Sequence, residues 1–443
     1  MIQYYMFKNF KIKLNLISDN YNKNVFYNYI FKILSLVLGL INTKMVIGYL
    51  GATLYGLWVT IASVISWMSS GDLGIGNGLR NELAKACGKN DIERQKKLVN
   101  AAFSAMITIS FIILLIIIIV SEIFFEIEIL PAQVRTSMYI TAGFFCLNLV
   151  LGVSQSVAYG YQLSWLTTLT LAETQLFSIL SVEMLKTAGV LPELNKFAII
   201  YGISTTIPNV LLIIILKIKN IEVIQPKTKI DNNITKSIMN TGLQFFGIQI
   251  CSVILYSTDD LIINKLINSE MVAKYDIITK IYNTGSNLFS ILLIALWSAV
   301  TYNLAQNNIK WIKDKINTLL KIWGVFSACV IVVSLCFNYI VKLWLGNQAV
   351  FYENSLIVIF AVYCSLTTFS AIFVNVLNGM GVIKLQFVLA VISAAINIPL
   401  SYVFVVFCDM GIFGVKLATL ISALVTALVM PVQAVMELKK REK

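Results

Sequence analysis

Apolar residues follow one another along this chain in long uninterrupted stretches rather than at every second position. A helix needs about 20 apolar residues to cross the hydrocarbon core of a bilayer, and these stretches are that long. Backbone groups in lipid must find partners within the protein, and runs without alternation exclude barrel strands, so the stretches are expected to be helices. Bounded by polar residues, glycine or proline, about twelve spans are predicted, at residues 25–48, 56–79, 98–121, 136–158, 164–187, 197–217, 237–256, 275–303, 318–339, 354–377, 382–406 and 411–435.

Composition agrees with this pattern. The chain has 443 residues, of which 58% are hydrophobic and only 13% are charged, whereas soluble domains are about a quarter charged. Twelve spans with short loops use most of the chain, which leaves no room for a soluble catalytic domain. Histidine is absent and none of the seven cysteines forms a C-x-x-C pair. We therefore expect an all-α integral membrane protein that is not an enzyme and that holds no metal or cofactor.

The positions of the lysines and arginines predict how the chain is oriented. The net charge of +12 could suggest a nucleic-acid partner, but the basic residues lie in loops, where they indicate topology instead. The N-terminal segment, the C-terminus and the loops near 80–97, 217–236, 305–321 and 378–384 hold 24 of them, and the intervening loops hold six. The positive-inside rule then places both termini in the cytoplasm, which requires an even number of spans.

Two loops half a chain apart share a pattern that predicts an internal repeat. The pattern N-x-I-x-x-x-K-x-x-x-N begins at Asn90 and again at Asn307. A weaker match relates residues 156–160 to residues 375–379 at nearly the same offset. Chance similarity between short lysine-rich loops is the alternative. A duplication of six helices predicts two six-helix bundles in the same orientation, related by a parallel pseudo-two-fold repeat.

The repeat divides the chain into five expected parts. Residues 1–24 form a cytoplasmic N-terminal segment, residues 25–217 the first bundle and residues 218–236 a cytoplasmic linker. Residues 237–436 form the second bundle, and residues 437–443 a cytoplasmic tail.

Polar groups inside the spans are costly to bury, and each is a hypothesis for a substrate cavity. Glu173 is the strongest because it is predicted near mid-depth, where a short carboxylate cannot reach the headgroups. Lys44 and Lys416 lie near span ends and could extend to the headgroups instead. Asp276 and Lys280 are four residues apart on one helix face and could neutralise one another. The complete set of candidates is Lys44, Asp72, Glu173, Gln244, Asp276, Lys280 and Lys416.

The glycine-rich segment from Asp72 to Gly78 has two interpretations. It superficially matches a phosphate-binding loop, but such a loop follows a strand, and this segment closes a predicted membrane span. The glycines are therefore expected to let helices approach closely. Asp72 could also cap a helix or pair with Arg80.

Several motifs resemble those of one family. These are the LG-x-x-x-YG turn at residues 50–56, the DLG-x-GNGLRN segment at residues 72–81, and the segments that begin at Asn378, Asn397 and Gly411. Together they resemble O-antigen (O-unit) flippases, which belong to the polysaccharide-exporter branch of the multidrug/oligosaccharidyl-lipid/polysaccharide superfamily. The resemblance covers nearly the whole chain.

The resemblance implies a function in lipopolysaccharide biosynthesis. The substrate would be an oligosaccharide linked to polyprenyl pyrophosphate, moved by alternating access from the cytoplasmic to the periplasmic leaflet of the bacterial inner membrane. A proton or sodium gradient would drive the cycle, and a polysaccharide polymerase and a chain-length regulator are candidate partners. The alternative is an ion-coupled multidrug exporter of the same superfamily. A sugar-chain polymerase is a third class, which the short external loops disfavour.

Overall fold

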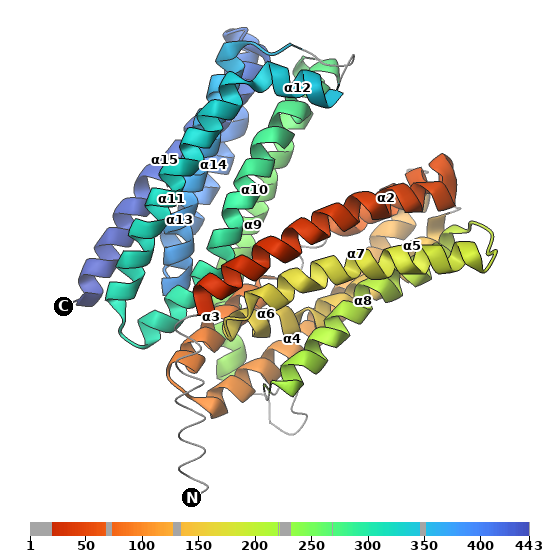
Figure 1. Ribbon diagram of the computed structural model, residues 1–443, viewed down its shortest axis with the longest axis horizontal. Coiled ribbons are helices and arrows are strands. Elements are labelled where there is room, and N and C mark those ends of the chain that lie inside the picture. Colours follow the sequence, from red (N-terminus) through yellow and green to blue (C-terminus); the bar gives the residue numbers. More distant parts are fainter. Residues whose placement is uncertain are drawn as a thin grey trace, which may run out of the picture. The chain divides into compact units, whose positions relative to one another are not determined.

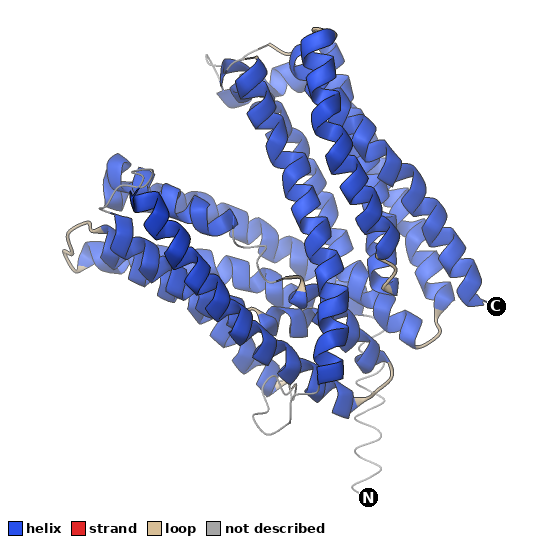
Figure 2. Cartoon of the chain, turned by 180° about the vertical axis from the view of Figure 1, so that it is seen from behind, coloured by secondary structure: helices blue, strands red, loops and turns tan. Residues whose placement is uncertain are grey.

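The computed structural model describes residues 20–67, 73–126, 134–219, 221, 232–267, 269–345 and 351–442. Within these ranges the chain consists of helices joined by short turns, and no strand is drawn among them (Figure 2). Nine helical segments in this part of the chain are long and apolar enough to cross a membrane. The expectation of an all-helical membrane protein is confirmed.

The chain divides into two compact units, residues Met1–Phe246 and Gly247–Lys443, and the division falls within helix α9. The helices of the N-terminal unit run from red to green in Figure 1. They are α2 (Asn20–Trp67), α3 (Ile75–Gly88), α4 (Ile92–Glu126), α5 (Arg135–Leu151), α6 (Val153–Gly160), α7 (Ser164–Thr187), α8 (Leu194–Ile218) and the first part of α9 (Asn232–Leu266).

The C-terminal unit contains the remainder of α9 and the helices drawn in green to blue in Figure 1. These are α10 (Ser269–Ala305), α11 (Ile309–Leu335), α12 (Phe337–Leu345), α13 (Asn354–Met380), α14 (Lys384–Tyr402) and α15 (Gly411–Glu442), with a π-helical turn, η4 (Val403–Phe407), after α14. Its core is centred on aromatic side chains, and the stacked rings of Tyr282 and Phe337 lie 5.8 Å apart.

Large apolar side chains remain exposed along many helices. Leu335 is 83% exposed and Leu191 is 80% exposed, and long runs on α2, α4 and α8 are similar. A water-soluble protein rarely leaves contiguous patches of this size uncovered. The exposed surface is therefore the one that faces lipid.

Near the glycine-rich segment, the helix boundaries differ from those of the predicted spans. One span was expected over residues 56–79, but α2 ends at Trp67 and α3 begins separately at Ile75, after Leu73 and Gly74 in left-handed conformations. Helix α3 then continues through much of the loop predicted at 80–97. The boundary between the first two predicted spans is a kink at Gly51, where φ is 73°.

A line of hydrogen bonds joins α2 to α7. The side chain of Asn28 donates to Ser164 Oγ (3.0 Å) and accepts from Thr168 (2.8 Å). Further along, Asn42 donates to Gln175 Oε1 (2.9 Å) and accepts from Ser178 (2.9 Å). Interhelical hydrogen bonds of this kind hold membrane helices together where the hydrophobic effect is weak.

Two glycines of the glycine-rich segment allow close packing against α9. A side chain at Gly74 would overlap the backbone carbonyl of Gly242, and one at Gly78 would overlap the carbonyl of Ile238. Both glycines therefore permit direct backbone contact within the N-terminal unit. The prediction that this segment serves helix packing is confirmed.

The turns at Asn90 and Asn307 have the same backbone geometry. Both residues are left-handed, with φ of 55° and 57°. The amide of Asn90 donates to Cys87 and that of Asp91 to Ala86; in the second turn, Asn307 donates to Leu304 and Asn308 to Asn303. Each turn thus ends its helix with the same pair of backbone bonds, in the manner of a Schellman cap.

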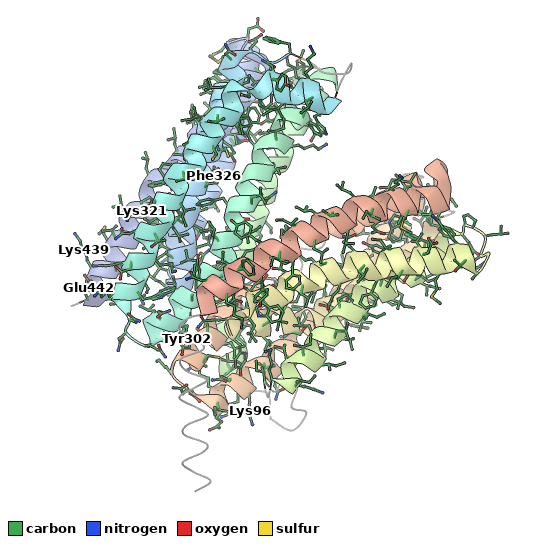
Figure 3. The ribbon with its side chains drawn as sticks, viewed as in Figure 1. Lys96, Tyr302, Lys321, Phe326, Lys439 and Glu442 are labelled. Carbon is green, nitrogen blue, oxygen red and sulfur yellow. The ribbon has the colours of Figure 1, made fainter. Side chains whose placement is uncertain are left out.

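Charged residues gather where α11 begins and α15 ends. Figure 3 shows Lys439 and Glu442 at the end of α15. Lys313 on α11 forms an ion pair of 2.5 Å with Glu442. This end of the C-terminal unit is the one predicted to face the cytoplasm.

Candidate functional site

Lys416 is the most deeply enclosed of the predicted site residues. It lies on α15, is only 5% exposed, and places Nζ 3.5 Å from the ring centre of Tyr363 and 4.5 Å from that of Phe360. Both rings belong to α13. The expectation that Lys416 could extend to the headgroups is wrong, because the aromatic side chains enclose its ammonium group.

A buried carboxylate that the sequence reasoning did not select lies close to this lysine. Asp259 on α9 is 4% exposed, and its charge interacts with that of Lys416. The hydroxyl of Tyr275 donates to Asp259 Oδ2 (2.6 Å), and Thr419 Oγ1 lies 3.1 Å from both carboxylate oxygens. Hydrogen bonds and an opposite charge are what allow a carboxylate to be buried.

Asn397 extends this cluster onto α14. Its Nδ2 donates to Thr419 Oγ1 (3.1 Å), while its buried Oδ1 has no hydrogen-bond partner among the described residues. The π-helical turn η4 begins six residues later and reshapes the end of α14. Such π-turns occur frequently at functional sites.

Five helices position this Asp259–Lys416 cluster, which we define as Asp259, Tyr275, Asn397, Lys416 and Thr419. They are α9, α10, α14 and α15, together with α13, which supplies the aromatic wall. Lys416 and Thr419 are three residues apart and therefore share a face of α15. The arrangement can hold or exchange one positive charge beside a carboxylate within the interior of the C-terminal unit.

Asp276 and Lys280 form the ion pair that their spacing allowed. Lys280 Nζ lies 2.5 Å from Asp276 Oδ2 on α10, and the two side chains are 62% and 46% exposed. Exposed pairs of this kind contribute little to stability. The two residues neutralise one another, as the structural interpretation of their spacing predicted.

The other predicted residues have sequence positions within the N-terminal unit. Glu173 on α7 is half-buried, and no hydrogen bond or ion pair joins it to another described residue. Lys44 on α2 is exposed, and Gln244 on α9 is half-buried. Asp72 lies outside the described residues.

Asp259 was missed because the predicted span over residues 237–256 ends three residues before it. Helix α9 in fact continues to Leu266 and carries Asp259 into the packed interior. The apolar residues Leu261, Ile262 and Ile263 that follow the acidic pair were the available signal. Among the described residues, no group of three histidine, cysteine, aspartate or glutamate side chains could hold a metal ion.

Part of the sequence matches a known protein family. The model of the MatE family matches residues 246–403. A Yersinia pseudotuberculosis protein named "Putative O-antigen export protein" is 20% identical over 417 residues, covering 89% of this chain and 91% of its own. A Salmonella typhi protein named "Putative O-antigen transporter" is 23% identical over 391 residues, covering 84% of this chain and 86% of its own.

Solved structures share the fold at low sequence identity. One described as an outward-facing multidrug resistance MATE family transporter of the MOP superfamily has a TM-score of 0.80 at 16% identity, covering 97% of this chain and 98% of its own. A MOP superfamily transporter from Pyrococcus furiosus, whose binding pocket is described as having reverse polarity, has a TM-score of 0.77 at 16% identity with the same coverage. This chain is therefore a multi-pass integral membrane protein that shares the fold of MATE transporters, and residues 246–403 of it match the MatE family model.

Proposed function

We propose that this protein is a flippase for an oligosaccharide linked to polyprenyl pyrophosphate, an O-antigen-type repeat unit. It would move this substrate from the cytoplasmic to the periplasmic leaflet of the bacterial inner membrane. The observation that carries the proposal is the similarity, over most of both chains, to proteins named as O-antigen transporters. The lipid-linked unit and the bilayer are then its partners, and a polymerase and a chain-length regulator act on the delivered unit.

The enclosed charges of the C-terminal unit do not distinguish an anionic from a cationic substrate, because the buried Lys416 has the buried carboxylate of Asp259 as its counter-charge. The alternative, an ion-coupled multidrug exporter, rests on the shared fold, and fold alone does not determine substrate.

The proposed architecture has twelve spans in two six-helix bundles, residues 25–217 and 237–436, related by a parallel pseudo-two-fold repeat. The matching turns at Asn90 and Asn307 support it. A second pair of turns supports it too: Gln162 and Gly381 are left-handed, with φ of 56° and 72°, and their amides bond to Tyr159 and Asn378. Rocking of the two bundles about the linker at 218–236 would give alternating access.

Coupling to a proton or sodium gradient would supply the free energy for the transport cycle. A coupling ion must bind one conformation more tightly than the other. Glu173 and the Asp259–Lys416 cluster are two sites where gain or loss of a positive charge would change the interior electrostatics. The remaining cavity candidates are Lys44, Asp72, Gln244, Asp276 and Lys280.

Deletion of the gene tests the proposal. We expect surface polysaccharide to disappear while the lipid-linked unit still forms and accumulates in the inner membrane. A plasmid copy of the wild-type gene should restore the polymer, and an empty plasmid should not. Normal surface polymer in the deletion strain, with no second flippase gene present, would refute the assignment.

A further inference from the structure

A cavity of about 280 Å³ lies inside the N-terminal unit, between α3, α4, α5 and α6. Three polar side chains of α6 line it, namely Gln155, Ser156 and Tyr159. The rest of its wall is mainly apolar, formed by Ile75, Leu79, Met106, Leu149 and Val153. None of these residues belongs to the Asp259–Lys416 cluster, so the cavity is a separate feature.

The polar residues of α6 have hydrogen-bonding capacity that the described protein atoms do not use. Ser156 is only 9% exposed, and its hydroxyl has no partner among the described residues. The hydroxyl of Tyr159 likewise has no hydrogen-bond partner among the described residues. Gln155 forms a hydrogen bond through Nε2 but not through Oε1. Gln155 and Tyr159 are half-buried, so their polar atoms are accessible from the cavity. The cavity therefore offers hydrogen-bonding groups to water or to a ligand.

Neighbouring side chains hold these groups in place. Gln155 Nε2 donates to Asn209 Oδ1 (2.8 Å), and Asn209 Nδ2 donates to Asn148 Oδ1 (2.9 Å). This chain of amides keeps the nitrogen of Gln155 turned to α8 and leaves its oxygen unpaired. The guanidinium of Arg80 lies 4.4 Å from the ring centre of Tyr159 and fixes that ring. Groups fixed in advance lose little entropy when a ligand binds.

The combination of groups favours a polyhydroxyl ligand. The hydroxyls of Ser156 and Tyr159 can each donate and accept, and the amide oxygen of Gln155 accepts. An anion alone is disfavoured, because it would meet the oxygen of Gln155. The apolar walls suit the C–H faces of a sugar ring. A volume of about 280 Å³ lies at the lower end of ligand pockets and fits one sugar residue, not a whole repeat unit.

We propose that this cavity is a subsite for a single sugar residue of the transported oligosaccharide. The proposal rests on the proposed function for the source of that sugar. In this proposal, Gln155, Ser156 and Tyr159 hold one pyranose-sized polyhydroxyl group. This binding can be tested independently of transport.

Saturation-transfer NMR on the purified full-length protein in nanodiscs provides the test. The probes are the monosaccharides released by acid hydrolysis of the cell's own surface polysaccharide. Ser156→Leu fills the cavity and should abolish the signal. Tyr159→Phe removes one hydroxyl and should weaken binding about three- to tenfold, as expected for one hydrogen bond. Ser154→Ala is the matched control, because Ser154 lies on α6 but bonds to the backbone of Leu151 (2.6 Å) and is not among the cavity-lining residues.

Two results would overturn the subsite. One is no signal from any released monosaccharide with the wild-type protein, which would mean that the cavity holds only water. The other is a signal that survives both Ser156→Leu and Tyr159→Phe, which would place binding elsewhere. Tyr159→Phe preserves shape and keeps the test decisive if Ser156→Leu does not fold.

Export in cells separates this proposal from the proposed function. If deletion of the gene removes surface polysaccharide and Ser156→Leu restores it as well as the wild type, the subsite is wrong and the flippase stands. If deletion leaves the polysaccharide unchanged, the flippase is wrong, while the NMR result still decides whether the cavity binds sugar.

Discussion

The ammonium nitrogen of Lys416 lies 3.5 Å from the ring centre of Tyr363, within the C-terminal unit. Cation–π contacts of this kind are strongest when water is excluded. The charge of Lys416 also interacts with Asp259, which is itself buried. The lysine is thus held by an aromatic wall on α13 and a carboxylate on α9. This arrangement determines what its removal should do.

Lys416→Met should destabilise the protein by about 3–5 kcal/mol, because it leaves the carboxylate of Asp259 buried without its counter-charge. Adding Asp259→Asn should recover much of that loss. Denaturation of the purified protein in detergent, analysed as a double-mutant cycle, measures the coupling between the two residues. Strictly additive losses would show that the two charges do not depend on one another.

Glu173→Gln keeps the size of the side chain and removes its charge. If Glu173 faces an aqueous cavity as proposed, transport should fall while the amount of protein in the membrane is unchanged. Glu183→Gln is the matched control, because Glu183 is an exposed residue of the same helix. Restoration of surface polysaccharide in the deletion strain is the measurement. Full restoration by Glu173→Gln would remove Glu173 from the coupling mechanism.

Gly74→Ala should destabilise the N-terminal unit. The added methyl group meets the carbonyl of Gly242, which cannot move aside as a side chain could, and Gly74 has a left-handed φ of 71°. Overpacking of this kind costs about 1–3 kcal/mol, and the unfavourable φ adds to it. Gly143→Ala is the control, since no atom lies within 4 Å of the added group. Thermal unfolding of the two purified variants should differ clearly, and equal melting temperatures would contradict the packing argument.

The stability contributed by Glu82 should depend on pH. This residue of α3 lies outside the candidate spans, and its carboxylate is 2.8 Å from both Lys85 Nζ and Arg94 Nη2. Burial alone would raise its pKa, but the hydrogen bonds and charges of Lys85 and Arg94 outweigh burial and hold the pKa below the ordinary value of 4.5. The carboxylate therefore stabilises the fold above about pH 4.5, and this contribution is lost as the pH falls through the lowered pKa.

Glu82→Gln tests that dependence. The difference in melting temperature between wild type and variant should be largest near neutral pH and should shrink below about pH 4.5. A difference that is constant across this range would show that the charge of Glu82 is not what stabilises the turn.

The predicted topology rests on the 24-to-6 distribution of basic residues. A cysteine at Lys229 should be labelled by a membrane-impermeant reagent only after the cells are opened. A cysteine at Glu126 should be labelled from outside in intact cells. The reverse labelling pattern would contradict the predicted orientation and would place both termini outside the cytoplasm.

Hydropathy and local spacing determined the helical class of this protein, because a segment that crosses lipid must satisfy its own backbone. Local spacing also determined the pairing of Asp276 with Lys280, because residues four apart on a helix meet whatever surrounds them. The shared turn pattern at Asn90 and Asn307 was visible for the same reason, since the hydrogen bonds that form it span only a few residues.

Tertiary structure alone decided the environment of Lys416. Helical periodicity shows which face a residue occupies but not which helix covers that face. The aromatic rings of Tyr363 and Phe360 come from α13, and Asp259 comes from α9, more than 150 positions earlier in the chain. A lysine near a span end could equally extend to the headgroups, and only the packing of these helices around it made burial the stable outcome.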